Sequence, residues 1–318
     1  MKKLTMMLLL ASLMIVLAAC GTKNKDEDKT SGSEANDVSE TISVEHELSD
    51  KPVEVKKNPE KVVVFDFGTL DTLDDLGVEV AALPRANVPT YLSKYDDDKY
   101  TNVGSLKEPD FEAIHAMKPD LIIISTRQAE LYDQFAEIAP TIYVGIDYAH
   151  YMDSFKHNAE LIGEIFGKEE EVQKELDDID AKIAAIKEKT KVSDETALIV
   201  LASEGKVSAY GPNSRFGLIH DVLGYKAADE KIEVSTHGQN ISFEYIFEKN
   251  PDVLFVIDRD AAIGNGASAK KSVENELVKK TNAYKNGKIV YLNGEYWYLS
   301  GGGLLSMKEM IEEIEASL

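Results

Sequence analysis

The stretch FEAIHAMKPDLIIISTR at residues 111–127 recurs as FEYIFEKNPDVLFVIDR at residues 243–259. The glutamate, the proline and the final arginine of the two copies are each separated by the same 132 positions. The corresponding pairs are Glu112 and Glu244, Pro119 and Pro251, and Arg127 and Arg259. An internal repeat of this length indicates two structurally equivalent units.

Each copy has the pattern of one α/β unit. A short helix is predicted from Phe-Glu, a Pro-Asp pair ends it, and an apolar strand follows with an arginine just beyond its end. Continuous apolar strands alternate with helical patterns along the chain, which predicts an α/β fold of two lobes with mainly parallel sheets covered on both faces. These strands are predicted at 62–65, 121–124, 142–144, 198–201 and 254–257.

The segment between the copies is predicted to be helical. Apolar residues recur at helical spacing through 151–191, and Gly167 is expected to divide the segment in two. The second part has no internal Gly or Pro, which favours one long helix joining the lobes. The predicted organisation is an N-terminal lobe at 46–167, the helix at 168–191 and a C-terminal lobe at 192–318.

The first residues have the features of an export signal. Lys2 and Lys3 precede an apolar run that is short for a membrane span, and the run ends in Leu-Ala-Ala-Cys. This ending resembles a bacterial lipobox, so residues 1–19 are interpreted as a signal peptide and Cys20, the one cysteine of the chain, as the site of lipidation, with palmitate among the expected acyl groups. The alternative is an ordinary secretory signal that leaves a free thiol. Residues 20–45 are predicted to be a flexible tether because the polar composition after Cys20 cannot bury enough surface to fold.

The chain is strongly acidic. Its formal net charge is −22, and loss of the two signal lysines would make it −24. Such a field repels nucleic acid and anionic lipid headgroups, so membrane attachment is assigned to the acyl anchor. An anionic ligand would require a local basic cluster.

Three arginines are candidates for that cluster. Arg127 and Arg259 follow equivalent strands, and ligands of parallel sheets bind at the carboxyl ends of strands. Arg215 lies in Gly-Pro-Asn-Ser-Arg-Phe-Gly at residues 211–217, a predicted turn before a helix. The alternative for each arginine is a surface ion pair with one of the 57 acidic residues.

Aromatic residues near the end of the chain could form a wall of the same cleft. Residues 296–298 read Tyr-Trp-Tyr, and in a strand Trp297 would point to the face opposite its two neighbours. Burial of Trp297 in the core is the alternative, and residues 301–303, all glycine, are expected to form a turn rather than a phosphate site. Further candidates for the cleft are Tyr298, Tyr210, Phe67, Arg85 and His237.

Glu112 and Glu244 occupy matching positions at the start of two predicted helices. A carboxylate there is favourable for the helix dipole alone. It could also expose a matched pair of charges to basic residues of a symmetric membrane partner.

Together the lipobox, the duplicated segments, the dividing helix and residues 211–217 resemble the class III iron-siderophore and vitamin B12 type of substrate-binding protein. Within this family, residues 64–68, 103–111, 235–239 and 297–303 are similar to the petrobactin-binding lipoproteins of Gram-positive bacteria. The resemblance implies a monomer that is held by lipid on the outer face of the cell membrane. It would carry a ferric catecholate siderophore to an ABC permease dimer with its ATPase.

The same resemblance implies roles for particular residues. Arg127, Arg215 and Arg259 would bind the ferric complex, and Glu112 and Glu244 would contact the permease. Two catecholates and one hydroxycarboxylate bring about six negative charges to Fe(III), and the resulting charge of about −3 would be balanced by three arginines.

Other functions are less well supported by the sequence. No two of the six histidines are spaced as a metal-ligand pair; they are His46, His115, His150, His157, His220 and His237. The Gly-Asn-Gly run that begins at Gly264 does not directly follow a strand, and no hydrolase, P-loop or zinc-protease motif is present, so neither a catalytic residue nor a cofactor is expected. A ferric hydroxamate, haem or cobalamin on the same fold remains the alternative ligand.

Overall fold

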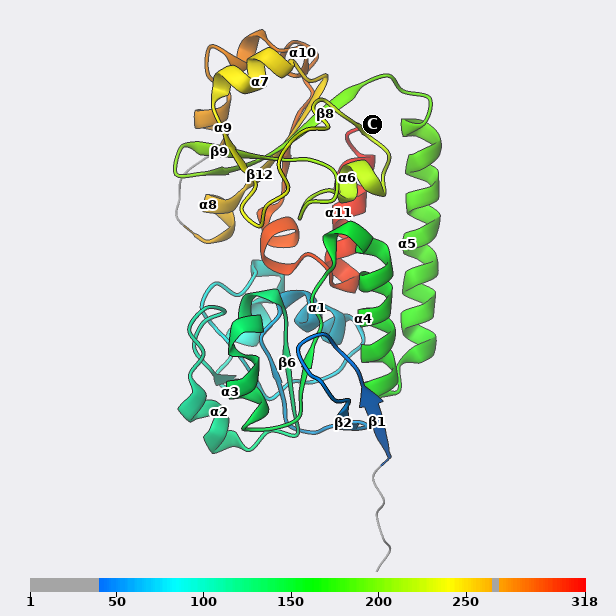
Figure 1. Cartoon of the computed structure of the whole chain (residues 1–318), viewed down its shortest axis with the longest axis vertical. Helices are drawn as coiled ribbons and strands as arrows, with labels where there is room; N and C mark the ends of the chain where they lie inside the picture. The colour runs from blue at the N-terminus through cyan, green and yellow to red at the C-terminus, as the bar shows by residue number, and fades with distance from the viewer. Residues whose placement is uncertain (1–39, 265–268) are drawn as a thin grey trace, which may run out of the picture. The chain divides into compact units, whose positions relative to one another are not determined.

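The computed structural model describes residues 40–264 and 269–318 (Figure 1). The signal peptide and the lipidation site Cys20, both expected from the sequence, lie outside these residues. Within the described part no helix is both long enough and apolar enough to cross a membrane.

The N-terminal lobe contains a five-stranded sheet in the order β5-β4-β3-β6-β7, and every neighbouring pair is parallel. Its central strands β3 and β6 are completely buried. Their apolar side chains enter separate clusters on the two faces of the sheet, which explains the continuous apolar sequence. The elements are β3 (Val62–Val64), α1 (Phe67–Asp75), β4 (Ala82–Leu83), η1 (Thr90–Asp96), β5 (Thr101–Asn102), α2 (Phe111–Met117), β6 (Leu121–Ile124), η2 (Thr126–Leu131), α3 (Tyr132–Ala136), β7 (Thr141–Tyr143) and η3 (Tyr148–His150).

A two-stranded hairpin precedes this sheet and corrects the predicted tether. Strand β1 (Thr41–Val44) pairs antiparallel with β2 (Val53–Lys56), and Ile42 and Val44 are buried. Regular structure therefore begins at residue 41, and residues 41–44 were assigned to the tether from the sequence. The strand alternates polar and apolar residues over only four positions, too few to distinguish it from the polar segment before it.

The C-terminal lobe contains a six-stranded sheet in the order β11-β9-β8-β12-β13, with β10 also paired to β8. Strands β8, β10, β12 and β13 pair in parallel, whereas β9 and β11 are antiparallel additions. The elements are β8 (Thr196–Ser203), β9 (Lys206–Tyr210), α6 (Leu218–Asp221), β10 (Lys226–Ala227), β11 (Gln239–Ile241), α7 (Phe243–Lys249), β12 (Val253–Asp258), α8 (Arg259–Ala262), α9 (Ala269–Val273), η4 (Val278–Lys280), α10 (Asn282–Lys285), β13 (Ile289–Leu292), η5 (Glu295–Ser300) and α11 (Leu304–Glu315).

The sequence repeat corresponds to a repeat in structure. Helices α2 and α7 begin after equivalent N-caps, Asp110 and Ser242, whose side chains accept hydrogen bonds from the backbone. Both helices end at a residue in the left-handed conformation, Lys118 with φ 51° and Asn250 with φ 44°. A buried parallel strand then follows in each lobe, which leads to the arginine at the same edge of each sheet.

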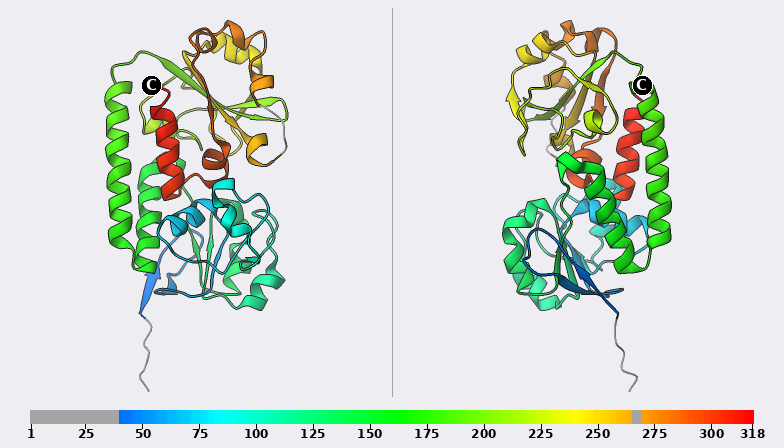
Figure 2. Two further views of the ribbon diagram at one scale, coloured as in Figure 1. Left: turned by 180° about the vertical axis from the view of Figure 1, so that it is seen from behind. Right: turned by 45° about the vertical axis from the view of Figure 1, so that its right-hand side comes forward.

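The long helix between the lobes packs with two others. Gly167, with φ 61°, ends α4 (Tyr151–Phe166) and separates it from the 22-residue α5 (Glu169–Thr190). Helix α5 packs against both α4 and α11, and Figures 1 and 2 show the three side by side. One apolar cluster includes residues of both sheets and of these helices, so the packing between the lobes is continuous. The fold class expected from the sequence, two α/β lobes joined by a long helix, is confirmed.

The start of α11 is packed tightly against α1 of the N-terminal lobe. A Cβ atom on Gly303 would lie 2.1 Å from Oδ1 of Asp71, so only glycine fits there. The buried Asp71 carboxylate accepts hydrogen bonds from the backbone N–H groups of Leu305 (3.2 Å) and Ser306 (3.0 Å) and from the Tyr91 hydroxyl (3.1 Å). Burial raises the pKa of Asp71 to about 7, against the opposing effect of these hydrogen bonds.

Candidate functional site

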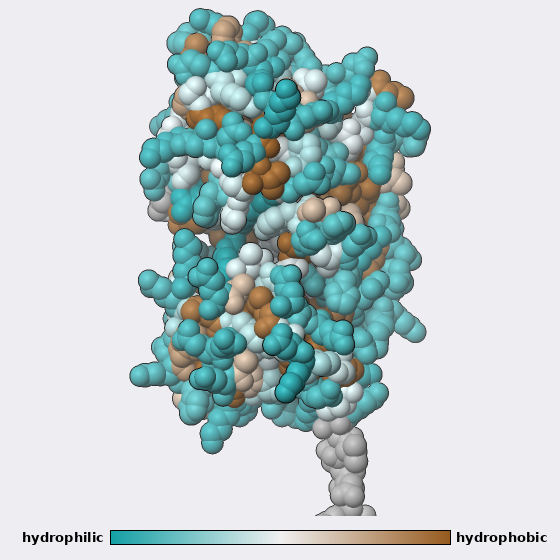
Figure 3. Space-filling model, in the orientation of Figure 1, coloured by the Kyte–Doolittle hydropathy of each residue, from teal (hydrophilic) through white to brown (hydrophobic). Residues whose placement is uncertain are grey.

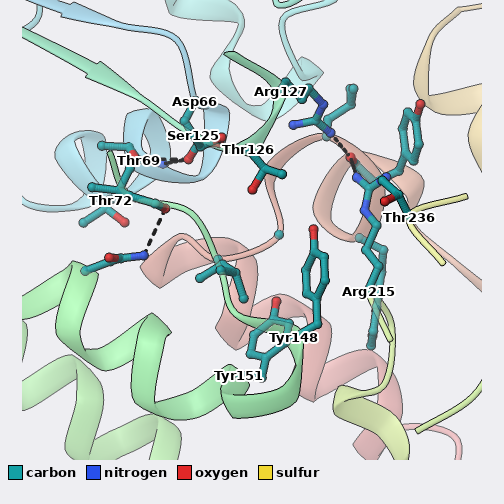
Figure 4. Close-up of a pocket in the computed structure, with 18 of the residues that line it drawn as sticks. Asp66, Thr69, Thr72, Ser125, Thr126, Arg127, Tyr148, Tyr151, Arg215 and Thr236 are labelled. Carbon is teal, nitrogen blue, oxygen red and sulfur yellow. Dashed lines mark hydrogen bonds between the residues drawn. The ribbon is translucent and has the colours of Figure 1, made fainter. Parts of the chain in front are cut away.

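A cavity of about 470 Å³ is lined by residues of both lobes (Figure 4). This volume is within the range of small-molecule sites. Its N-terminal wall comes from segments that follow β3, β6 and β7, in agreement with the rule that ligands of parallel sheets bind at the carboxyl ends of strands. The polar and aromatic side chains of the lining include Asp66, Lys107, Ser125, Arg127, Tyr148, Tyr151, Asn158, Arg215, His237, Trp297 and Tyr298.

Three arginine side chains surround Tyr298. The guanidinium carbons of Arg215, Arg259 and Arg127 lie 4.6, 5.6 and 5.9 Å from the centre of its ring. The Tyr298 backbone carbonyl accepts hydrogen bonds from Arg127 (2.7 Å) and Arg215 (2.5 Å), and its hydroxyl accepts one from Arg259 Nε (3.0 Å). The chain has four arginines, so three of the four gather at one residue.

The charges of this cluster act on one another. Burial, and then the charge of Arg215, lower the pKa of Arg127. Burial acts to raise the pKa of Tyr298, but its hydrogen bond with Arg259 and the three arginine charges lower it overall. The cluster therefore has an excess of positive charge that a bound anion would neutralise.

Arg127 and Arg215 have no carboxylate within 4.0 Å in the described residues, so the surface ion pair considered from the sequence is wrong for both. Arg259 differs. It lines a smaller adjoining cavity, donates to the Ser203 hydroxyl (2.7 Å) and lies 4.0 Å from Asp260. His237 lines both cavities, which places it where they meet.

Trp297 and Tyr298 lie on a helix and not on a strand, so the alternation of faces considered for residues 296–298 does not occur. Glu295–Ser300 forms η5, a π-helix, a rare form that is frequent at functional sites. Trp297 is 2% exposed, and its indole N–H donates to Glu313 Oε2 (2.8 Å). It borders the cavity while most of the ring is packed in the core.

The weaker candidates lie outside the cavity lining. Arg85 forms an exposed ion pair with Asp98 (3.2 Å) and also donates to the Asp96 carbonyl. Tyr210 is 2% exposed and packs edge-on against Phe216, while Phe67 is buried in the N-terminal core. The structure therefore does not bring these three residues to the main cavity.

Several lining residues were not singled out from the sequence, namely Asp66, Lys107, Ser125, Tyr148, Tyr151 and Asn158. Asp66 directly follows the buried strand predicted at 62–65, so the strand-end rule that selected Arg127 applies to it equally. Tyr148 belongs to η3, and Tyr151 and Asn158 belong to α4; the approach of these elements to the cavity depends on tertiary packing.

Glu112 and Glu244 are exposed in the first turns of α2 and α7, at equivalent positions of the two lobes. The pKa of Glu244 is lowered by backbone and Ser242 hydrogen bonds. Both carboxylates are thus accessible to a partner, on a protein whose surface is mostly hydrophilic in the view of Figure 3. Within residues 40–264 and 269–318, no group of three His, Cys, Asp or Glu side chains is arranged to hold a metal ion.

Comparison with known proteins agrees with this architecture. The petrobactin-binding protein YclQ of Bacillus subtilis (strain 168) is 52% identical over 320 residues, which cover 100% of this chain and 99% of the relative. The crystal structure of YclQ aligns with a TM-score of 0.85 and 56% identity, covering 87% of this chain and 98% of that one. The periplasmic catecholate-siderophore binding protein VctP of Vibrio cholerae aligns with a TM-score of 0.83 and 37% identity, covering 87% and 100%. Residues 62–296 match the family model described as periplasmic binding protein, and the chain belongs to this family.

Proposed function

We propose that this chain is the extracytoplasmic substrate-binding protein of an ABC importer and that it binds an anionic ferric catecholate siderophore of the petrobactin type. The observation that carries the proposal is the cluster of Arg127, Arg215 and Arg259 around Tyr298. In a chain with net charge −22, two of these arginines lack a carboxylate partner within the described residues and line a cavity between the lobes.

The charge of the ligand fits this cluster. Three guanidinium groups, each a charge-assisted donor, match a ferric complex of about −3. A ferric hydroxamate or cobalamin would leave these cations without a counter-charge, which disfavours the alternatives. The 52% identity to a protein named for petrobactin binding supports the choice of siderophore.

The remaining parts of the proposal concern delivery. Glu112 and Glu244 contact basic residues of the permease, and the protein acts as a monomer without catalysis of its own. Residues 1–19 direct export, and Cys20 carries the lipid that holds the protein on the outer face of the membrane. Incorporation of labelled palmitate, abolished in Cys20→Ala, tests the anchor.

Ligand binding is tested with the soluble protein that starts after Cys20. Tyrosine and tryptophan emission is followed during titration with ferric petrobactin, ferric enterobactin, a ferric hydroxamate and cyanocobalamin. We expect saturable quenching by the catecholate complexes at nanomolar to low-micromolar concentration. Quenching by the hydroxamate or the cobalamin alone would overturn the ligand class.

A variant with Arg127, Arg215 and Arg259 all changed to alanine should lose this quenching. Arg85→Ala is the matched control, because it removes the fourth arginine of the chain, which lies outside the cavity. Equal loss in the control and the triple variant would show that total charge, and not the cluster, governs binding.

A further inference from the structure

The anion-binding cavity contains a carboxylate. Asp66 is the one acidic residue among the described side chains that line it, together with Lys107, Arg127 and Arg215. A negative charge in the wall of such a cavity repels an anionic ligand and lowers its affinity. We therefore expect the Asp66 carboxylate to face a positively charged group of the ligand.

The capping role of Asp66 does not explain its charge. Its Oδ2 accepts hydrogen bonds from the Thr69 backbone N–H (2.8 Å) and hydroxyl (3.0 Å) at the start of α1, and its Oδ1 accepts one from the Ser125 hydroxyl (2.8 Å). A neutral asparagine caps a helix about as well as aspartate. The charge of Asp66 acts to raise the pKa of Arg127, but no lysine or arginine of the described residues lies within 4.0 Å of the carboxylate, so no ion pair occupies it.

Other residues that line the cavity are also suited to a cation. The Asn158 amide nitrogen donates to the carbonyls of Val144 (3.0 Å) and Gly145 (3.1 Å), which leaves Oδ1 as the acceptor without a donor among the described residues. Tyr148 and Tyr151 point into the cavity between Asp66 and Arg215 in Figure 4. Aromatic faces attract cations, and both oxygens accept hydrogen bonds from them.

We propose that Asp66, Asn158, Tyr148 and Tyr151 form a subsite for a protonated amine on the siderophore, while the arginines bind the ferric catecholate centre. The inference rests on the proposed function and refines its ligand class: the preferred siderophore carries both charges. The carboxylate and the arginines then each meet a ligand group of opposite sign, so a purely anionic complex of the same shape binds more weakly.

The test uses two ferric complexes that differ in one group. In the first, two catecholamide units are joined by a linker with one secondary amine; in the second, that amine is acetylated. The wild-type protein should prefer the amine complex. Asp66→Asn, which keeps the cap and removes the charge, should weaken binding of the amine complex by about tenfold and leave the acetylated complex unchanged or bound more tightly.

Two further variants complete the test. Asp153→Asn removes the same charge from an exposed position in the first turn of α4, outside the cavity lining, and should change neither affinity. Tyr148→Phe removes one hydrogen-bond acceptor from the subsite, keeps the ring and should weaken binding of the amine complex alone, which keeps the test open if Asp66→Asn proves unstable in thermal unfolding.

An equal change in affinity for both complexes in Asp66→Asn, or no change in either, would contradict the subsite. This result is distinct from failure of the proposed function, in which the wild-type protein would bind neither ferric complex.

Discussion

The two copies of the repeat place an arginine at the same structural position but give it different surroundings. Arg127 follows strand β6 of a fully parallel sheet. It lines the main cavity and donates a hydrogen bond to the Tyr298 carbonyl. Arg259 lines the adjoining cavity, lies 4.0 Å from Asp260 and donates to the Tyr298 hydroxyl. The repeat thus determines where the cations are placed, while the neighbours of each copy determine how much charge remains available to a ligand.

The strongest test of this difference compares Arg127→Ala with Arg259→Ala. Because Arg127 has no carboxylate partner in the described residues and is the more enclosed, its loss should weaken ferric petrobactin binding by about 100-fold, as expected for a lost hydrogen bond to a charged group. Loss of Arg259, already partly neutralised by Asp260, should cost about tenfold. Fluorescence titration measures both, and equal losses would refute the unequal roles.

In contact with the permease, by contrast, the two lobes are expected to contribute equally. Glu112→Arg and Glu244→Arg each place a positive charge on an exposed helix start where we expect a basic partner surface. Siderophore-dependent iron uptake by cells should fall about tenfold or more in either variant, while affinity for the ferric complex is unchanged. Glu188→Arg, an exposed position on the separate helix α5, is the control, because Glu248 lies one turn from Glu244 on the same helix face. Normal uptake in both variants would exclude the docking role.

Much of the fold was accessible from the sequence because its determinants are local. The Pro-Asp turns, the buried strands and Gly167 each specify a conformation from adjacent residues. The site was accessible in part: the strand-end rule selected Arg127 and Arg259, and the same rule applied to Asp66 would have added it.

The rest of the site depends on contacts that sequence spacing does not reveal. Residues 296–298 alternate in a way that suits a strand, but Trp297 donates to Glu313 and the segment folds as a π-helix. Arg85 resembles the other arginines in sequence, yet its ion pair with Asp98 is on the surface. The approach of Tyr148, Tyr151 and Asn158 to the cavity follows from how α4 packs, and no local pattern encodes it.

The N-terminal lobe contributes a buried carboxyl group to the contact between the lobes, and its effect on stability should depend on pH. Asp71 of the N-terminal lobe is buried against the start of α11 with its pKa raised to about 7, above the ordinary value of about 3.9 in the unfolded chain. The folded state therefore retains the proton between these values, and this contribution to stability is lost as pH rises from about 4 to about 7. In the Asp71→Asn variant the side chain at this position has no ionisable group, so this pH dependence is absent.

The free energy of unfolding of Asp71→Asn minus that of the wild type should thus increase by about 2 kcal/mol between pH 5 and pH 8, because only the wild type loses stability. Urea unfolding of both proteins at the two pH values measures the difference, in which the other titrating groups cancel. Glu313→Gln is a useful comparison, because burial also raises the pKa of Glu313, near the end of α11. A pH-independent difference for Asp71→Asn would show that this carboxyl titrates normally.

The smallest expected effect concerns the residues that end the two equivalent helices, α2 and α7. Lys118 and Asn250 both adopt the left-handed conformation, which is unfavourable for lysine but tolerated by asparagine. Lys118→Gly should stabilise the protein by about 0.5 kcal/mol, since relief of the strain exceeds the added entropy of the unfolded chain. Asn250→Gly should instead destabilise it by about 0.5–1 kcal/mol, because Asn250 Oδ1 accepts a hydrogen bond from the Asn282 backbone N–H (2.8 Å) that glycine cannot replace. The midpoints of urea unfolding measure both changes. An increase in both midpoints would mean that backbone strain alone governs these caps. Shifts in opposite directions would show that each copy ends its helix in a different way.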